Sequence, residues 1–289
     1  MAYSMGIVCM NTKEEIIDFK PTKEYFIGVD SDGTAFDSMN IKHIKSMYPA
    51  AVEVWDFGTQ CAEFEKIWKR INLYSKTRGI NRFLGLLAAF EDLGANSPVK
   101  DISAFREYIK NNSTYSNATL QSWMLDNYSL LLDDVMRWSK KSDDYFEEYT
   151  KGLLPFKNVK PCLEILAQKA DIMVVSSASG KGLDKDWSFS GLTEYTSLIA
   201  GQEIGSKDVQ LQIGAAGKYS PLKTLMIGDA PGDLDAANSI GALFFPIMPG
   251  NEDESWLLLK EEALDCFFEG SYKGKYEDLL IEEFINLLG

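Results

Sequence analysis

Two aspartates stand one residue apart directly after an apolar run. Residues 25–29 are strand formers, Asp30 and Asp32 follow, and the run ends in the turn-forming pair Gly33-Thr34. Because neighbouring side chains of an extended chain point in opposite directions, Asp30 and Asp32 share a side. A buried strand that ends in this way delivers both carboxylates to the crevice beyond the strand tips, where open α/β sheets bind ligands.

Two carboxylates placed so close repel each other, so either one keeps a proton or a cation lies between them. Both arrangements suit phosphoryl transfer. One carboxylate can attack phosphorus to form an aspartyl-phosphate, while the other protonates the leaving oxygen and later deprotonates water. Mg²⁺, which prefers oxygen ligands, would make the attack of one anion on another feasible.

Asp-x-Asp-Gly also occurs in ordinary turns, so the rest of the chain must decide between a turn and a catalytic site. A calcium loop of the EF-hand type is not expected, because its fifth and twelfth positions here hold Thr34 and Ile41.

More polar residues occur where other predicted strands end or the following helix begins. They are Ser176 and Ser177 after the strand at 171–175, Lys207 at the start of a helix, and Asp229 and Asp233 after the strand at 224–227. In a doubly wound sheet these strand ends lie together. Carboxylates could hold a cation there, a serine hydroxyl and backbone amides could bind phosphate oxygens, and a lysine could offset the negative charge.

These segments resemble the four motifs of the haloacid dehalogenase (HAD) superfamily. The sequence DSDGT at 30–34 matches the first motif, DxDGT, and VVS at 174–176 matches the second, an apolar strand that ends in a hydroxyl residue. Lys207 matches the third motif, and GDAPGD at 228–233 matches the fourth. The first and fourth motifs are specific, and the resemblance accounts for the whole predicted core.

The resemblance implies a role for each motif residue. Asp30 would be the nucleophile and a Mg²⁺ ligand, and Asp32 would be the general acid and base with its backbone carbonyl on the metal. Ser176 and Ser177 would bind the phosphate, and Lys207 would orient and neutralise the nucleophile and the phosphate. Asp229 and Asp233 would be the other metal ligands. An acid at position 32 is typical of phosphatases and phosphomutases in this superfamily, not of dehalogenases. The chemistry agrees, because an alcohol leaving group needs a proton and a halide does not.

Composition limits the classes of partner. The chain of 289 residues carries 29 Lys and Arg against 43 Asp and Glu, a net charge of −14, which argues against nucleic-acid or anionic-membrane binding. No signal peptide is found, nor an apolar run of the roughly 20 residues that span a bilayer. The four cysteines lack CxxC spacing and are expected to be reduced thiols in a cytoplasmic protein. The single histidine, His43, is expected to be structural rather than catalytic.

Helical periodicity without strands fills the stretch after the first strand. The predicted segments are 41–47, 61–73, 82–93, 102–110, 122–139 and 143–151. An insert of this length is expected to form a separate domain, residues 37–151, which resembles the helical C1 cap of the superfamily. Alternating strands and helices elsewhere predict an α/β fold, a Rossmann-like doubly wound parallel sheet built from residues 1–36 and 152–289.

Three other basic residues are candidates for a role at the site. Lys218 competes with Lys207, but only eleven residues separate it from Asp229, which leaves little room for a helix between them. Arg78 and Arg82 flank a glycine turn between two helices of the insert and are candidates for gripping an anionic group of the substrate, although a solvated corner is the simpler interpretation. The stretch at 249–271 suggests no function.

The sequence therefore predicts a Mg²⁺-dependent phosphomonoester hydrolase that acts on a small phosphorylated metabolite through an aspartyl-phosphate. The nearest alternative is a phosphomutase of the β-phosphoglucomutase type, which would return the phosphoryl group to a sugar. A phosphate-binding protein without turnover is a further alternative, although every core motif residue is present. A signalling receiver domain would lack both the DxDGT pattern and the long insert.

Overall fold

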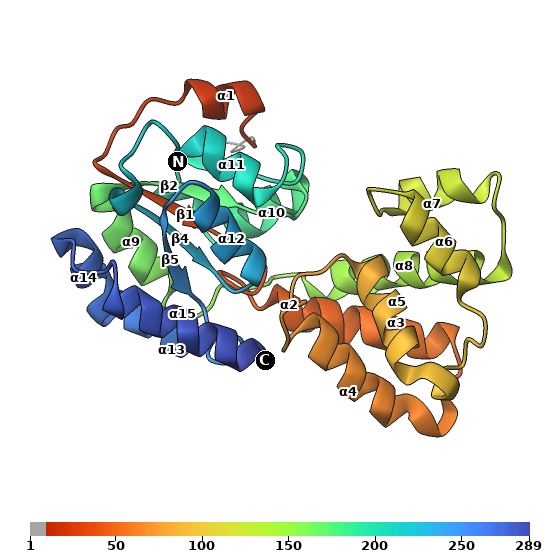
Figure 1. Ribbon diagram of the computed structural model, residues 1–289. Helices are drawn as coiled ribbons and strands as arrows, with labels where there is room; N and C mark the ends of the chain where they lie inside the picture. Colours follow the sequence, from red (N-terminus) through yellow and green to blue (C-terminus); the bar gives the residue numbers. More distant parts are fainter. Residues whose placement is uncertain (1–9) are drawn as a thin grey trace. The chain divides into compact units, whose positions relative to one another are not determined.

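The computed structural model describes residues 10–289, which form two compact units (Figure 1). The first, here the core unit, comprises the chain up to Asp37 together with Gly152–Leu287. The second, here the helical unit, comprises Ser38–Lys151 and the last two residues. The sequence predicts the insert at 37–151 and a core that continues to 289. The division of the structure starts the insert at Ser38 and groups Leu288 and Gly289 with it.

The core unit is built on a parallel five-stranded sheet in the order β3-β2-β1-β4-β5, which confirms the predicted α/β class. Its strands are β1 Tyr25–Val29, β2 Ala170–Val175, β3 Leu198–Ala200, β4 Thr224–Gly228 and β5 Leu243–Pro246. β1 lies in the middle, paired with β2 and β4. Because all strands run the same way, the residues that follow β1, β2 and β4 emerge at one edge of the sheet.

Both faces of the central strand are buried. Ile27 and Val29 belong to an apolar cluster that includes residues of α9, Val159–Lys169. Alternation sends Gly28 to the opposite face, where an added Cβ would lie 2.8 Å from the Met226 sulfur, so a larger residue would require the Met226 side chain to shift. Burial of each large aliphatic side chain in such a cluster contributes about 1.5–3 kcal/mol.

The remaining helices of the core unit cover the two faces of the sheet, except α1, which packs against α11 (Figure 1). They are α1 Lys13–Asp18, α10 Gly180–Phe189, α11 Lys207–Gly214, α12 Pro231–Ser239, α13 Glu252–Leu258, α14 Leu264–Glu269 and α15 Lys275–Leu288, with a π-helical stretch Leu259–Ala263 between α13 and α14. A capping box starts α1, since Glu15 N donates to Thr12 Oγ1 at 3.2 Å and Thr12 N donates to Glu15 Oε2 at 2.7 Å.

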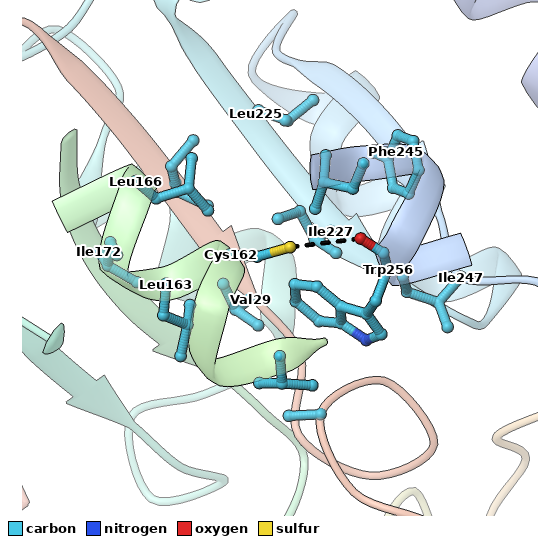
Figure 2. Packing of buried hydrophobic residues seen from close by; sticks show 14 of the residues in the cluster. Val29, Cys162, Leu163, Leu166, Ile172, Leu225, Ile227, Phe245, Ile247 and Trp256 are labelled. Carbon is cyan, nitrogen blue, oxygen red and sulfur yellow. Dashed lines mark hydrogen bonds between the residues drawn. The ribbon is translucent and has the colours of Figure 1, made fainter. Parts of the chain in front are cut away.

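The segment 249–271, which suggested no function, packs into the main apolar cluster. Figure 2 shows the fully buried Trp256 of α13 beside Cys162 of α9, whose thiol donates to the Trp256 carbonyl at 3.3 Å. Burial raises the pKa of the Cys162 thiol to about 12, so this cysteine is an inert core residue.

The helical unit has a separate core of its own. Its helices are α2 Ser38–Asn40, the π-helical stretch Ile41–Met47, α3 Tyr48–Val54, α4 Cys61–Asn72, α5 Arg82–Leu93, α6 Ser103–Asn111, α7 Asn117–Met124 and α8 Leu130–Tyr149. The indoles of Trp68 and Trp138, both fully buried, donate to the carbonyls of His43 and Met47. His43 itself is buried in the π-helical stretch, in line with a structural role. Within residues 38–151 no strand is found.

Two predicted helix boundaries in this unit are wrong. The segments 122–139 and 143–151 were expected, whereas α7 ends at Met124 and a single helix, α8, runs from Leu130 to Tyr149. Ser129 restarts the helix because its hydroxyl accepts from Leu132 N at 3.2 Å. The polar residues near 140 do not interrupt it, since the Ser142 hydroxyl donates to the Trp138 carbonyl inside the helix. Across residues 10–289, no helix is both long and apolar enough to cross a membrane.

Candidate active site

The acidic turn begins where the central strand ends. Asp30 N donates to the Ile227 carbonyl at 3.0 Å, so β4 still holds the backbone of the first aspartate. The turn closes when Phe36 N donates to the Ser31 carbonyl at 3.1 Å and Gly33 N donates to the Phe36 carbonyl at 2.9 Å. Gly33 has a φ of +80°, a conformation that glycine adopts without strain.

Three buried carboxylates meet at this edge of the sheet. One oxygen from each of Asp30, Asp229 and Asp233 lies within 4.8 Å of the others, and all three residues are at most 3% exposed. The Thr34 hydroxyl donates to Asp229 Oδ1 at 2.7 Å, and it also lies 3.4 Å from Asp30 Oδ2. This set of hard oxygen donors fits a divalent cation such as Mg²⁺.

Lys207 joins the same cluster from the first residue of α11. Its Nζ lies 3.0 Å from Asp30 Oδ1 and 2.6 Å from Asp233 Oδ1. Lys218, the rival candidate, donates instead to the Ile16 carbonyl at 2.6 Å, in the segment that packs α1 onto the unit. The structure therefore brings Lys207, and not Lys218, to the carboxylates.

The pKa values of the clustered groups are shifted by burial and by their mutual charges. Burial raises the pKa of Asp30 well above its ordinary value; Lys207 lowers it, and the carboxylates of Asp233 and Asp229 raise it further. Burial likewise raises the pKa of Asp233. Burial alone would lower the pKa of Lys207, but Asp233 and Asp30 outweigh this and raise it. One ammonium group thus faces three buried acids, and a divalent cation would restore the balance.

The fourth motif is shaped by close packing. An added Cβ on Gly228 would lie 2.4 Å from the Asp233 side chain, so the strand must end in glycine for that carboxylate to reach the cluster. Asp233 Oδ2 accepts from Ala230 N at 3.1 Å, which caps the start of α12 and fixes the carboxylate.

The end of β2 supplies the predicted phosphate-binding serines. Ser176 is buried, and its hydroxyl accepts from Ala178 N at 3.1 Å, which turns the backbone sharply after the strand. Ser177 is exposed. Both follow the strand next to β1, at the same edge of the sheet as the acidic turn.

Gln210 is a contributor that the sequence did not indicate. This fully buried side chain of α11 accepts from Ser176 N at 3.0 Å through Oε1. Its amide nitrogen donates to the carbonyls of Ser176, Gly201 and Gly205 at 2.9–3.0 Å. One side chain therefore ties the end of β2 to the loop that leads into Lys207. The sequence feature that could have indicated this role is a polar residue on the apolar side of a helix, three positions after Lys207.

Asp186 of α10 also went unnoticed in the sequence. Burial, and to a lesser degree the negative charge of Asp32, raises the pKa of Asp186 to about 6. Asp32 itself is half-buried in the turn, one residue beyond Ser31. The two carboxylates therefore influence each other at neutral pH, although they lie on different elements.

The candidate arginines lie in the helical unit. Arg78 is buried, and its guanidinium donates to the Leu73 carbonyl at 2.9 Å. Arg82 forms an ion pair with Asp143 and donates to the Ser139 hydroxyl at 3.2 Å, so it ties α5 to α8. These contacts give Arg82 a structural task within its own unit, and the substrate role of both arginines stays a prediction.

Taken together, the core unit presents an acidic side chain at the tip of the central strand, flanked by two more carboxylates and a lysine. Such a site can hold a divalent cation, bring an anionic substrate next to a carboxylate nucleophile and neutralise the charge that builds up on reaction.

No protein-family model matches the chain, and no curated protein matches it in sequence. Similar solved structures do exist. One is described as a predicted phosphoglycolate phosphatase from Haemophilus somnus, with 17% identity, a TM-score of 0.49, and coverage of 79% of this chain and 88% of that one. A haloacid dehalogenase-like hydrolase from Xanthomonas campestris has 13% identity, a TM-score of 0.48, and coverage of 93% and 100%.

The L-2-haloacid dehalogenase from Xanthobacter autotrophicus is a further match, with 16% identity, a TM-score of 0.39 and coverage of 77% of each chain. Structures described as a HAD-superfamily hydrolase, as phosphatases and as dehalogenases are thus among those that resemble this chain.

Proposed function

We propose that this protein is a HAD-superfamily phosphatase that hydrolyses a small phosphomonoester through an aspartyl-phosphate and depends on Mg²⁺. The observation that carries the proposal is the position of Asp30. It lies at the tip of the central strand, in a buried cluster with Asp229 and Asp233, with Lys207 Nζ 3.0 Å from one of its oxygens.

Each residue has a distinct task in the proposed reaction. A carboxylate oxygen of Asp30 attacks phosphorus, which forms an oxygen–phosphorus bond and breaks the bond to the leaving alcohol oxygen. Asp32 gives its proton to that oxygen, and it then takes a proton from the water that hydrolyses the aspartyl-phosphate. Lys207 offsets the charge of nucleophile and phosphate, while the hydroxyl of Ser176, with Ser177 beside it, binds phosphate oxygens.

When Mg²⁺ is bound by Asp30, Asp229 and Asp233, it supplies the positive charge that lets one anion approach another. Thr34 supports this arrangement from the protein side, because its hydroxyl donates to Asp229 at 2.7 Å and so fixes the orientation of that carboxylate.

The identity of residue 32 favours a phosphatase over a dehalogenase. Release of an alcohol requires a proton donor, and Asp32 is an acid two residues after the nucleophile. A net charge of −14 favours a small metabolite over nucleic acid as the partner. We also propose that the protein is cytoplasmic, because its cysteines lack CxxC spacing and are expected to be reduced.

The test is phosphate release from a panel of phosphomonoesters that includes an aryl phosphate, with Mg²⁺ or with a chelator, for the native protein and Asp30→Asn. The proposal predicts Mg²⁺-dependent release that falls by at least roughly 10³-fold in the variant, as expected when a nucleophile is removed. Release that survives the substitution would sink the assignment of Asp30.

Two further assays separate the alternatives. Halide release from 2-haloacids without phosphate release would indicate a dehalogenase. Conversion of a sugar phosphate to its isomer without net phosphate release would indicate a phosphomutase.

A further inference from the structure

Two buried indoles contact the acidic turn from helices outside the four motifs. Trp256 of α13 donates through Nε1 to the Thr34 carbonyl at 2.7 Å. Trp187 of α10 donates through Nε1 to the Ser31 hydroxyl at 3.0 Å. Both tryptophans are fully buried. The turn that carries Asp30 thus accepts hydrogen bonds from two indole N–H groups, one on α10 and one on α13.

The contact made by Trp256 leads directly to the carboxylate cluster. The indole fixes the carbonyl of Thr34, and the hydroxyl of the same residue donates to Asp229 Oδ1 at 2.7 Å. Because this hydroxyl also lies 3.4 Å from Asp30 Oδ2, Thr34 stands between two of the three clustered acids. The residue whose carbonyl accepts from the indole is therefore the same residue whose hydroxyl donates to Asp229.

The indole is itself firmly held. Figure 2 shows it among the apolar side chains of the main cluster, with Val29 and Ile227 among its labelled neighbours in that cluster. The thiol of Cys162 donates to the Trp256 carbonyl at 3.3 Å, which adds a polar contact on the helix backbone. A donor anchored in this way can define the geometry of a residue that contacts it, since neither partner can easily move.

We propose that Trp256 is a positioning residue for the metal site, acting through Thr34 on Asp229. This inference rests on the proposed function. It gives the segment 249–271 a task that its sequence did not suggest. Trp187 differs from Trp256 in that its indole donates to the hydroxyl of Ser31, which is not one of the proposed metal ligands.

The test measures Mg²⁺ affinity by calorimetry, which requires no substrate and no turnover. Trp256→Phe keeps an aromatic ring in the cluster and removes the N–H. We expect it to bind Mg²⁺ roughly 10-fold more weakly, within the range found when a residue behind a metal ligand is lost. Thr34→Val removes the hydroxyl through which the effect travels. Trp256→Phe added to Thr34→Val should therefore weaken binding no further, because the two changes interrupt one chain of contacts.

Trp138→Phe is the matched control. Trp138 is also fully buried and donates to a backbone carbonyl, that of Met47 at 3.0 Å, but it does so in the helical unit. We expect a comparable loss of thermal stability and unchanged Mg²⁺ affinity. Should Trp256→Phe fail to fold, 3-benzothienylalanine at position 256 replaces the N–H by sulfur within the same bicyclic ring.

The outcomes are distinct. Weaker Mg²⁺ binding in Trp256→Phe that disappears in the Thr34→Val background supports the proposal. The positioning role is overturned if a folded Trp256→Phe binds Mg²⁺ with native affinity. It is also overturned if the losses of Mg²⁺ affinity in Trp256→Phe and Thr34→Val add up in the double variant. Either result leaves the proposed function standing. Native protein that binds no Mg²⁺ overturns both.

Discussion

Gly228, the last residue of β4, leaves no room for a side chain beside the carboxylate cluster. A Cβ at this position would lie 2.4 Å from two carbon atoms of the Asp233 side chain. Gly232, in the first turn of α12, has nothing within 4 Å of the same added atom. Two glycines of one motif, four residues apart, therefore stand in opposite packing environments.

The pair gives a prediction with an internal control. Gly228→Ala should lower the free energy of unfolding by about 1–3 kcal/mol, because the methyl group must push Asp233 aside. The same variant should weaken Mg²⁺ binding. Gly232→Ala should raise the free energy of unfolding by about 0.5–1 kcal/mol, since alanine loses less backbone freedom in a helix. Urea unfolding monitored by circular dichroism measures both, and equal effects of the two changes would contradict the packing argument.

At the scale of elements, Gln210 connects a strand and a helix that both supply predicted site residues. Its amide accepts from Ser176 N and donates to the carbonyls of Ser176 and the loop at 201–205. The end of β2 and the start of α11 are therefore coupled through one buried side chain. Gln212, two residues along the same helix, is exposed.

Gln210→Met keeps the length of the side chain and removes its hydrogen bonds. We expect a loss of about 1–3 kcal/mol of stability, the cost of leaving a buried backbone donor and acceptor unpaired. Both Ser176 and Lys207 should also lose their fixed positions, so inhibition by inorganic phosphate should weaken. Gln212→Met is the control and should change stability by no more than about 0.5 kcal/mol. A stable Gln210→Met with native phosphate affinity would show that the coupling is not needed.

Asp171, the second residue of β2, lies at the amino-terminal end of the strand, away from the carboxylate cluster. Its carboxylate accepts from the backbone N–H of Thr22 and Lys23 at 2.8 and 3.0 Å and from the Tyr219 hydroxyl at 2.7 Å. Burial alone would raise the pKa of Asp171, but the hydrogen bonds from Thr22 and Tyr219 prevail and lower it. The folded protein therefore favours the charged form more than the unfolded chain does.

This lowered pKa predicts a pH dependence of known sign. The stabilisation from Asp171 is fully present above the unfolded pKa of about 3.9 and is lost as the pH falls through the lower folded pKa. Asp171→Asn should therefore cost about 2 kcal/mol at pH 7, the scale of hydrogen bonds to a charged group, and progressively less as the pH approaches 3. Denaturant unfolding at several pH values measures this difference, with Asp235→Asn, an exposed aspartate of α12, as the control. A pH-independent cost would argue against a charge effect.

The whole molecule shows which of these features a sequence can reveal. The strands β1, β2 and β4 consist mostly of apolar residues followed by polar or turn-forming ones, so the positions predicted at 25–29, 171–175 and 224–227 could be found from local pattern. The residues of the acidic turn follow one another in the sequence, and so do those of the fourth motif, so each group can be recognised locally. The sheet then brings the two groups together. Trp256 could not be linked to the site in this way, because 222 residues separate it from Thr34 and only the packed fold makes them neighbours.

The same reasoning explains the errors in the helical unit. Helical periodicity locates α5 well, since its apolar residues recur regularly between Asn81, which caps its start, and Gly94. The break between α7 and α8 was missed because it depends on the Ser129 cap, a local hydrogen bond that apolar spacing does not register. Long-range side-chain contacts and single caps are therefore the features that the sequence alone does not determine.

Division into two units also predicts how the molecule unfolds. Trp68 and Trp138 are fully buried inside the helical unit, and both indoles bond to carbonyls of that unit. A segment with its own apolar core can fold alone. A peptide of residues 38–151 should therefore show a cooperative urea transition, with a free energy of unfolding of about 5 kcal/mol or more.

Near-ultraviolet circular dichroism is the decisive measurement for this fragment, because fixed tryptophans give a signal that fluctuating ones lose. Trp138→Phe within the fragment should lower both that signal and the unfolding midpoint, since it removes a buried donor from the core. A fragment with helical far-ultraviolet signal, no near-ultraviolet signal and strong binding of a hydrophobic dye would be a molten globule. In that case the helical unit would owe its packing to the rest of the chain, and its independence as a domain would be lost.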